Sequence, residues 1–167
     1  MKAWSKMKTM ISRILPLFAA LALLCGCERH TETFFDTPFV RIEDANGMSS
    51  MDVDHTLDNL LTEIRVIVSA SKNYFTEPIT VEYEIIAGDG LKEGTDFRIQ
   101  SSHRSPLTFS LGTYSLPIRL IWYKSASFDP SKDNTLTLRL TGCSVPEMLL
   151  GVPGPDEKKK EFIFKQL

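Results

Sequence analysis

The stretch ITVEYEIIA, residues Ile79–Ala87, is the segment that decides the fold. Apart from Ile86, its apolar side chains fall at every second position and are separated by threonine or glutamate. This alternation has the two-residue period of a β-strand with one buried and one solvated face. The same pattern returns along the chain and predicts further strands at residues 39–42, 62–70, 96–100, 107–111, 116–123, 135–141 and 162–164.

These segments make about eight strands, with turn-forming residues between them and no convincing amphipathic helix. We therefore expect an all-β protein folded as an antiparallel two-sheet β-sandwich, with Trp122 in its core. Residues 58–68 also fit a helical period, but their β-branched side chains favour a strand. Pro117 lies inside a predicted strand and cannot donate a hydrogen bond there, so we expect it at a sheet edge or a bulge. Residues 44–59 show no clear period and predict a loop.

The N-terminus has the features of an export signal. Four basic residues and no acidic residue accompany an 11-residue apolar stretch, Ile14–Leu24, which is too short to span a bilayer as a helix. The residues Leu24-Cys25-Gly26-Cys27 that follow resemble a bacterial lipobox, and this resemblance implies that Cys27 is lipidated and becomes the mature N-terminus. Modification of Cys25 fits less well, because Leu24 would precede the cut. A buried helix or an ordinary secretory signal is the alternative.

The predicted organisation is a lipoprotein signal peptide over residues 1–26, a polar tether over 27–37 and a sandwich domain over 38–167. Beyond residue 26 the chain holds 15 basic against 21 acidic residues, a net charge of −6, which gives no reason to expect a nucleic-acid partner. Once Cys25 is removed and Cys27 is modified, Cys143 is the remaining cysteine, so the domain has no internal disulfide. We expect Cys143 to act as a small buried side chain rather than as a nucleophile.

A family resemblance runs over about residues 78–142. The sequence VEYEIIAG at 81–88 leads into GLKEGTDF at 90–97, and LTF at 107–109 is followed by a glycine turn and SLPIRL at 115–120. This order resembles the Calx-beta motif. It is also similar to a set of uncharacterised lipoproteins of Gram-negative bacteria, whose C-termini often read like GPDEKKK at 154–160. The resemblance implies an Ig-like β-sandwich that is lipid-anchored at the cell envelope, at the outer membrane, and it implies no reaction.

Some Calx-beta domains bind calcium, so the resemblance raises the question of a calcium site. Calcium takes six to eight oxygen ligands, largely from converging carboxylates. The matching region holds Asp129 and Asp133, but Lys132 lies between them and no glutamate is present. We therefore expect no metal and no cofactor. Asp96, in the Gly-x-Asp-aromatic piece of the motif, is expected to cap its own turn by accepting backbone N–H groups.

The chain shows no arrangement typical of an enzyme. His103 lies among serines in SSHRS at 101–105, but no nucleophile elbow surrounds them. No pair of carboxylates stands out as a glycosidase pair, and no phosphate loop or dinucleotide fingerprint is present. Asp52, Asp54 and His55 are close in sequence, yet they fit a polar loop at least as well as a cation site. We therefore expect no enzymatic activity.

Aromatic residues are the remaining candidates for binding: Tyr74 and Phe75 at a loop tip, Tyr123 on the outward face of a strand and Phe128 in the next loop. Exposed together at one end of the sandwich, they could stack on sugar rings or anchor a protein; the alternative is that they pack over the sheet ends. We expect a non-enzymatic cell-envelope lipoprotein, a binding, adhesion or glycan-uptake accessory module. Its partners would be the membrane, through acyl chains, and a glycan or an envelope protein. The alternatives are a structural subunit that docks on an outer-membrane assembly and, least favoured, a small envelope enzyme.

Overall fold

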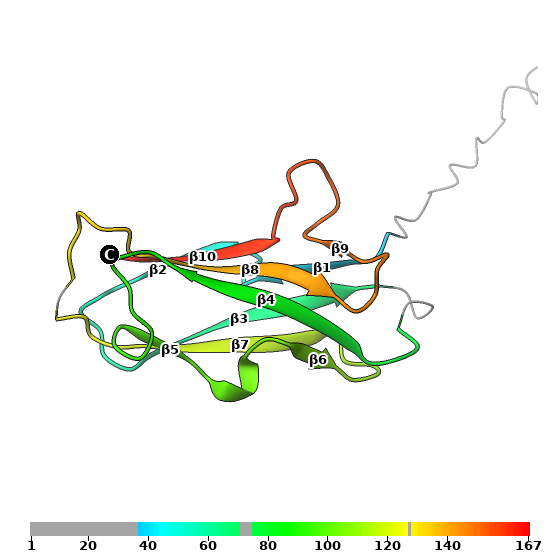
Figure 1. Cartoon of the computed structure of the whole chain (residues 1–167), viewed down its shortest axis with the longest axis horizontal. Helices are drawn as coiled ribbons and strands as arrows, with labels where there is room; N and C mark the ends of the chain where they lie inside the picture. The colour runs from blue at the N-terminus through cyan, green and yellow to red at the C-terminus, as the bar shows by residue number, and fades with distance from the viewer. Residues whose placement is uncertain (1–36, 71–74, 127) are drawn as a thin grey trace, which may run out of the picture. The chain divides into compact units, whose positions relative to one another are not determined.

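A computed structural model describes residues 37–70, 75–126 and 128–167 (Figure 1). The predicted signal peptide, Cys27, Tyr74 and the tether up to residue 36 lie outside the described residues. Among the described residues, no helix is long and apolar enough to cross a membrane. The described residues form ten strands and one short 3₁₀ helix: β1 (Phe39–Glu43), β2 (Ser50–Val53), β3 (Leu60–Ser69), β4 (Ile79–Ala87), β5 (Phe97–Ile99), η2 (Ser101–His103), β6 (Leu107–Phe109), β7 (Ser115–Trp122), β8 (Thr135–Cys143), β9 (Leu149–Leu150) and β10 (Glu161–Gln166).

The strands form two five-stranded sheets with a shared buried core, so the all-β fold is confirmed. One sheet has the order β5-β7-β3-β1-β9 and the other the order β2-β10-β8-β4-β6. Figure 1 shows the two sheets as layers, with the long strands β3 and β7 in one and β4 and β8 in the other. Most neighbours run antiparallel, but β1 pairs with β9 and β10 pairs with β2 in parallel. The expectation of a purely antiparallel sandwich was therefore wrong at these two pairs.

The strands β2 and β9 lie in segments without clear periodicity, and β2 corrects the loop predicted over residues 44–59. They contain four and two residues, which is too short for an alternating pattern to be visible. Both lie at sheet edges and are held by backbone bonds, as where the Leu149 N–H donates to the Pro38 carbonyl at 2.9 Å. Backbone hydrogen bonds do not depend on side-chain type, so these two strands could not be predicted from the sequence pattern.

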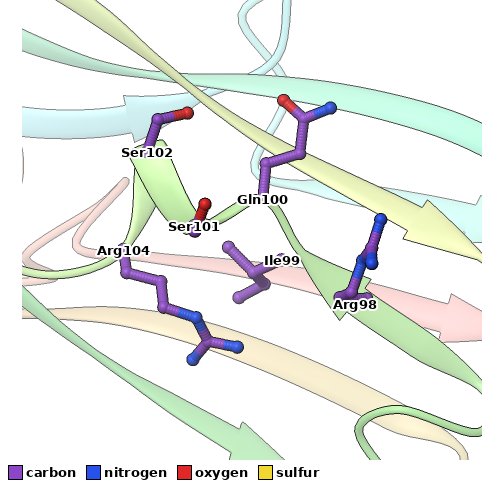
Figure 2. Close-up of a pocket in the computed structure, with 6 residues that line it drawn as sticks. All are labelled: Arg98, Ile99, Gln100, Ser101, Ser102 and Arg104. Atoms are coloured by element: carbon purple, nitrogen blue, oxygen red, sulfur yellow. The ribbon is translucent and has the colours of Figure 1, made fainter.

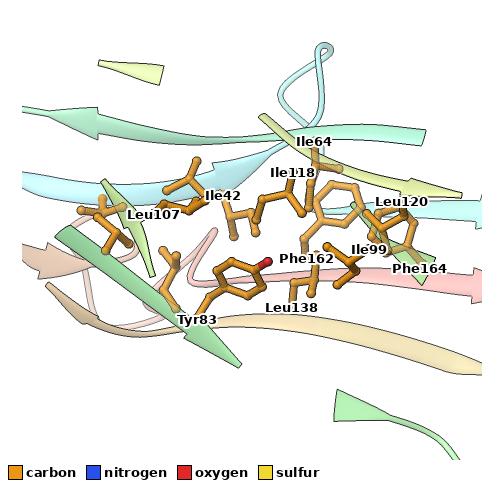
Figure 3. Packing of buried hydrophobic residues seen from close by; sticks show 14 of the residues in the cluster. Ile42, Ile64, Tyr83, Ile99, Leu107, Ile118, Leu120, Leu138, Phe162 and Phe164 are labelled. Carbon is orange, nitrogen blue, oxygen red and sulfur yellow. The ribbon is translucent and has the colours of Figure 1, made fainter. Parts of the chain in front are cut away.

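Side chains from both sheets fill the space between them (Figure 3). Trp122 is fully buried there, which confirms its predicted core position. Its indole N–H donates to the Thr62 hydroxyl at 3.0 Å, and its ring lies 5.7 Å from that of Phe97 and 5.4 Å from that of Phe164. The indole therefore has both apolar neighbours and a partner for its polar atom, as a buried tryptophan requires.

Pro117 lies in the part of β7 that has no partner strand on its β5 side. This part of β7 is in effect a sheet edge, which is where the proline was predicted. The strand β5 pairs with only the last three residues of β7, so it leaves Pro117 uncovered. On the other side, Pro117 is opposite Arg65 of β3. Because the Val68 N–H donates to the Tyr114 carbonyl and bonded pairs alternate along an antiparallel ladder, this pair is a non-bonded one. The missing N–H of Pro117 therefore removes no ladder hydrogen bond.

Asp96 caps the turn that leads into β5, as expected. Its side chain is buried, and its Oδ2 accepts the Lys92 N–H at 2.9 Å. Its Oδ1 accepts the Ser125 hydroxyl, also at 2.9 Å, which links this turn to the loop after β7. The carboxylate therefore joins the turn before β5 to the loop after β7.

Candidate functional site

A polar hollow of about 460 Å³ lies where the chain leaves β5 for β6. The strand β5 belongs to one sheet and β6 to the other, so the hollow lies along the side of the sandwich and not at the ends where the candidate aromatics were expected. Figure 2 shows the side chains around it, which come from the end of β5, from Gln100 between β5 and η2, from η2 and from the residue after η2. The described lining residues are Arg98, Ile99, Gln100, Ser101, Ser102 and Arg104.

Backbone and side-chain bonds hold this segment against both sheets. The Gln100 N–H donates to the Arg119 carbonyl at 3.0 Å, and the Arg119 N–H donates to His103 Nδ1 at 3.2 Å, so the segment extends the hydrogen bonding of β7. On the other side, the Tyr83 hydroxyl donates to the His103 carbonyl at 2.5 Å, and the Tyr83 N–H donates to the Ser105 hydroxyl at 3.0 Å. The wall of the hollow is therefore fixed from β4 and from β7.

The hollow carries positive charge. Arg104 forms an ion pair with Glu93, whereas Arg98 forms no ion pair with any described residue. Its six described lining residues include no carboxylate, and they offer two guanidinium groups, one amide and two hydroxyls. A guanidinium can donate two parallel hydrogen bonds to a carboxylate, and hydroxyl and amide groups match the hydroxyls of a polyol. The chemistry of the hollow therefore suits a hydroxyl-rich or anionic ligand.

The structure does not bring the predicted aromatic residues together. Tyr74 lies outside the described residues. Phe75 belongs to the segment before β4, whereas Tyr123 and Phe128 belong to the segment after β7. Figure 1 shows these two segments at opposite ends of the sandwich. Phe75 is therefore not an exposed binding aromatic, and it follows the alternative of packing over the sheet end: it is 6% exposed, belongs to the apolar core and has its ring centroid 5.0 Å from that of Tyr114.

The other two aromatic residues are half-buried. The ring of Phe128 stacks on His55 with a centroid separation of 4.2 Å and an interplanar angle of 12°. The backbone N–H of Tyr123 donates to the Asp96 carbonyl at 2.9 Å. Among the described residues, no ring contact joins Tyr123 and Phe128, so the two do not form a shared aromatic surface.

The acidic candidates are each used by their own turns. Asp129 accepts the N–H and hydroxyl of Ser131, and these hydrogen bonds lower the pKa of the Asp129 carboxyl. Asp133 accepts the N–H and hydroxyl of Thr135 in the same way. Asp54 accepts the N–H and hydroxyl of Thr56 in a separate turn. Among the described residues, no group of three or more His, Cys, Asp or Glu side chains is arranged to hold a metal ion.

Cys143 is half-buried at the end of β8, and its Sγ lies 3.6 Å from the Sδ of Met148. Burial raises the pKa of the Cys143 thiol. A raised pKa lowers the fraction of thiolate, which is the nucleophilic form. The predicted role as a small packed side chain agrees with this environment.

The residues of the hollow were missed from sequence, because SSHRS at 101–105 was assigned to a loop without a site. One signal was available. Arg98 and Arg104 lie six positions apart in a domain that is acidic overall. The sequence did not show that the chain crosses between the two sheets at this point, and this crossing is what forms the hollow.

No protein-family model and no curated protein sequence matches this chain. Among solved structures, it is similar to Bacteroides thetaiotamicron EndoBT-3987 in its crystal structure with Man5GlcNAc product. The two share 13% sequence identity and a TM-score of 0.50, and the match covers 75% of this chain. This chain spans 30% of the length of that protein. At this level of identity the likeness concerns the fold alone, and it supports the assignment to an all-β, sandwich-like fold.

We expect His103 to titrate below the ordinary histidine pKa of about 6.5. Burial is the main cause of the lowered pKa, the charge of Arg119 adds to it, and Glu63 opposes it. An unfolded chain then binds the proton more readily than the folded one, so the free energy of unfolding should fall as the pH drops below about 6.5 and level off below the folded pKa. Proton NMR of the imidazole and urea unfolding between pH 8 and pH 5 measure both quantities.

His103→Asn is the matched variant for this measurement. Asparagine offers a side-chain oxygen that can accept the Arg119 N–H and does not titrate. It should therefore keep the loop in place and flatten the pH dependence between pH 8 and pH 5. A histidine midpoint above 6.5 would contradict the expectation and would mean that Glu63 outweighs burial.

Proposed function

We propose that this protein is a non-enzymatic, lipid-anchored glycan-binding module of the bacterial cell envelope, with an Ig-like, Calx-beta-like sandwich as its scaffold. The observation that carries the proposal is the hollow beside β5 and η2. Its lining combines an arginine without an ion pair among the described residues, an amide and two serine hydroxyls, on a segment held by both sheets.

A binding role suits this hollow better than hydrolysis. Glycoside hydrolysis generally uses two carboxyl groups that flank the scissile bond at a set separation. Glu93 contacts the lining through its ion pair with Arg104. The described lining offers hydrogen-bond donors and positive charge instead, which favour retention of a glycan, above all one that carries a carboxylate.

Two further observations support the proposal. The N-terminal pattern that ends at Cys27 resembles that of bacterial lipoproteins and would place the domain at the cell envelope, where glycans are abundant ligands. The fold likeness to part of EndoBT-3987 adds support, because the crystal structure of that protein holds a Man5GlcNAc product.

Replacing Arg98 by alanine is expected to weaken glycan binding by about tenfold or more, because a charge-assisted hydrogen bond contributes about 1.5–3 kcal/mol. Acidic oligosaccharides should lose more affinity than neutral ones, since Arg98 would pair with a carboxylate. A glycan array identifies ligands of the processed protein, and calorimetry then gives the dissociation constants for the wild type and the variant.

Arg139→Ala is the matched control. Arg139 lies on β8 in the opposite sheet, where it pairs with Glu84 and Glu161 at 3.1 and 2.5 Å. Its removal takes away one exposed arginine without touching the hollow, so glycan affinity should not change. Equal losses in both variants would point to general attraction by charge, and an unchanged affinity in Arg98→Ala would place the glycan elsewhere.

A row of exposed isoleucines favours docking on an envelope protein as the second candidate function. Ile86 of β4 and Ile163 of β10 both lie opposite Thr137 of β8, on the outward face of the sheet, and are 37% and 38% exposed. The ion pairs of Arg139 border this row. An Ile163→Lys variant that keeps glycan binding and loses a co-purifying outer-membrane protein would support this second function.

A further inference from the structure

Four of the six arginines among the described residues lie on one side of the sandwich. Successive side chains of a strand point to opposite faces of its sheet, so the buried positions of each strand show which side chains point outward. In the sheet β5-β7-β3-β1-β9 the outward positions include Arg41 of β1, Arg65 of β3, Arg98 of β5 and Arg119 of β7. We call the outward side of this sheet the arginine face.

Apolar side chains lie between these arginines. In the pairing of the strands, Ile67 lies opposite Arg41. Pro117 lies opposite Arg65 in the same way. Leu61 is 54% exposed, the largest value among the apolar residues of this face. The arginine face is therefore amphipathic, and its apolar residues are Phe39, Leu61, Ile67, Pro117, Ile121 and Leu149.

The carboxylates of the arginine face do not cancel its positive charge. Among the described strand residues of this sheet, the outward acids are Glu43 and Glu63, and each is shared by two cations. Arg65 and Arg119 each donate one hydrogen bond to Glu63, so further N–H groups of both guanidiniums are left to donate elsewhere. The ion pairs are Arg65–Glu63 at 3.1 Å, Arg119–Glu63 at 2.8 Å, Arg41–Glu43 at 3.1 Å and Lys159–Glu43 at 2.6 Å.

The outward side of the other sheet has the opposite sign of charge. Its described strand positions carry more acidic than basic side chains, as does the domain as a whole. The positive charge of the domain is thus concentrated on one of its two broad faces. The charged residues that point outward from the strands of this second sheet are Asp52, Glu82, Glu84 and Glu161 against Arg139 and Lys165.

The strand that carries Arg41 is also where the chain enters the domain. Ten residues lead from Cys27 to Thr37, the first described residue, and ten residues span at most about 35 Å. Acyl chains on Cys27 would therefore hold this corner of the arginine face within about 35 Å of the bilayer. A short tether of this kind gives the domain a high effective concentration at the lipid surface.

We propose that the arginine face docks on anionic phospholipid headgroups of the membrane that holds the acyl chains. Guanidinium groups donate strong hydrogen bonds to phosphate, and each arginine near an anionic lipid surface strengthens binding by about fivefold. The apolar side chains between the arginines suit the interfacial layer of a bilayer. This inference rests on the proposed lipid anchor and not on the glycan site, and it leaves the isoleucine row of the other sheet facing away from the membrane.

Protection of arginines from chemical modification tests this docking. The processed, acylated protein is placed in vesicles of phosphatidylcholine alone or of equal parts phosphatidylcholine and phosphatidylglycerol, and phenylglyoxal modification is followed by mass spectrometry. Arg119 and Arg139 form a matched pair within the molecule, because their side chains are 42% and 41% exposed and both form ion pairs with glutamate. Phosphatidylglycerol is expected to slow the modification of Arg119 by about tenfold or more and to leave Arg139 unchanged. Salt at about 1 M should remove the difference, because the Debye length is then about 3 Å.

Charge-neutral variants show whether the arginine face itself is responsible. Arg65→Gln removes one half-exposed cation and should reduce the protection of Arg119 by about fivefold. Arg139→Gln is the matched control on the opposite face and should leave that protection intact. Arg41→Gln tests the same prediction if Arg65→Gln fails to fold. Arg98 is left unchanged throughout, because it lines the polar hollow of the proposed glycan site.

Flotation of the vesicles separates the failure of the inference from the failure of the lipid anchor. Protein that floats with both kinds of vesicle while Arg119 reacts equally in both would uphold the anchor and overturn the docking of the arginine face. Protein that floats with neither would remove the anchor and the inference together. Protection in phosphatidylcholine alone that rises with the amount of protein per vesicle would assign the arginine face to contact with a second copy of the chain and would also overturn the inference.

Discussion

Replacing Trp122 by alanine is expected to lower the free energy of unfolding by about 3–5 kcal/mol. The side chain is fully buried between the two sheets and contacts Phe97 and Phe164. Alanine would leave a cavity there, and it would also leave the buried hydroxyl of Thr62 without the indole N–H that it accepts at 3.0 Å. Urea unfolding followed by far-UV circular dichroism measures the loss.

Two variants separate the causes of this loss. Thr62→Val removes the partner of the indole and keeps the ring, so it should cost about 1–3 kcal/mol. Leu61→Ala alters a 54% exposed side chain on the same strand and should change stability by about 0.5 kcal/mol or less. A loss below about 1 kcal/mol for Trp122→Ala would contradict the placement of this residue at the centre of the core.

The second large effect concerns Cys27, which lies outside the described residues. Cys27→Ala is expected to reduce incorporation of labelled fatty acid to background, because the thiol is where the lipobox resemblance places the acyl chains. Each buried methylene contributes about 0.8 kcal/mol to membrane binding, so two or more acyl chains anchor a protein durably. The measurement is labelling of growing cells with palmitate, with intact mass spectrometry of the purified protein.

Cys25→Ala is the matched control, since it removes the neighbouring thiol two positions earlier. It should leave the fatty-acid label in place. Loss of label in Cys25→Ala alone would move the modified residue to Cys25, and an unacylated wild-type protein would contradict the lipoprotein proposal altogether. Protease treatment of intact cells, beside lysed cells, then tells whether the acylated protein faces outward.

Much of the fold could be predicted because, in its long strands, the alternation of apolar and polar residues shows which side chains are buried. In β4, Ile79, Val81 and Tyr83 are buried while Glu82 and Glu84 are exposed, as the alternation of the sequence indicates. The eight strands with a visible period were found, although their ends differ by a few residues. The two that were missed, β2 and β9, are edge strands held by backbone bonds, and their parallel pairing has no side-chain signature.

The candidate sites were much less predictable. Aromatic residues in predicted loops were the natural candidates, but whether a loop residue is exposed depends on what packs over it, as the contact of Phe75 with Tyr114 illustrates. The polar hollow exists because the chain passes from one sheet to the other between Ile99 and Leu107. A pattern with a period of two cannot report such a crossing.

The sequence by itself therefore determined the all-β class, most of the strands, the inward position of Trp122 and the expectation of an N-terminal lipid anchor, since each depends on local pattern. The tertiary structure decided which loops meet. It paired Arg104 with Glu93 and left Arg98 without an ion pair among the described residues, and it buried the Gln166 amide without a partner among them. These outcomes depend on distances between residues far apart in the chain, and a local sequence pattern does not report such distances.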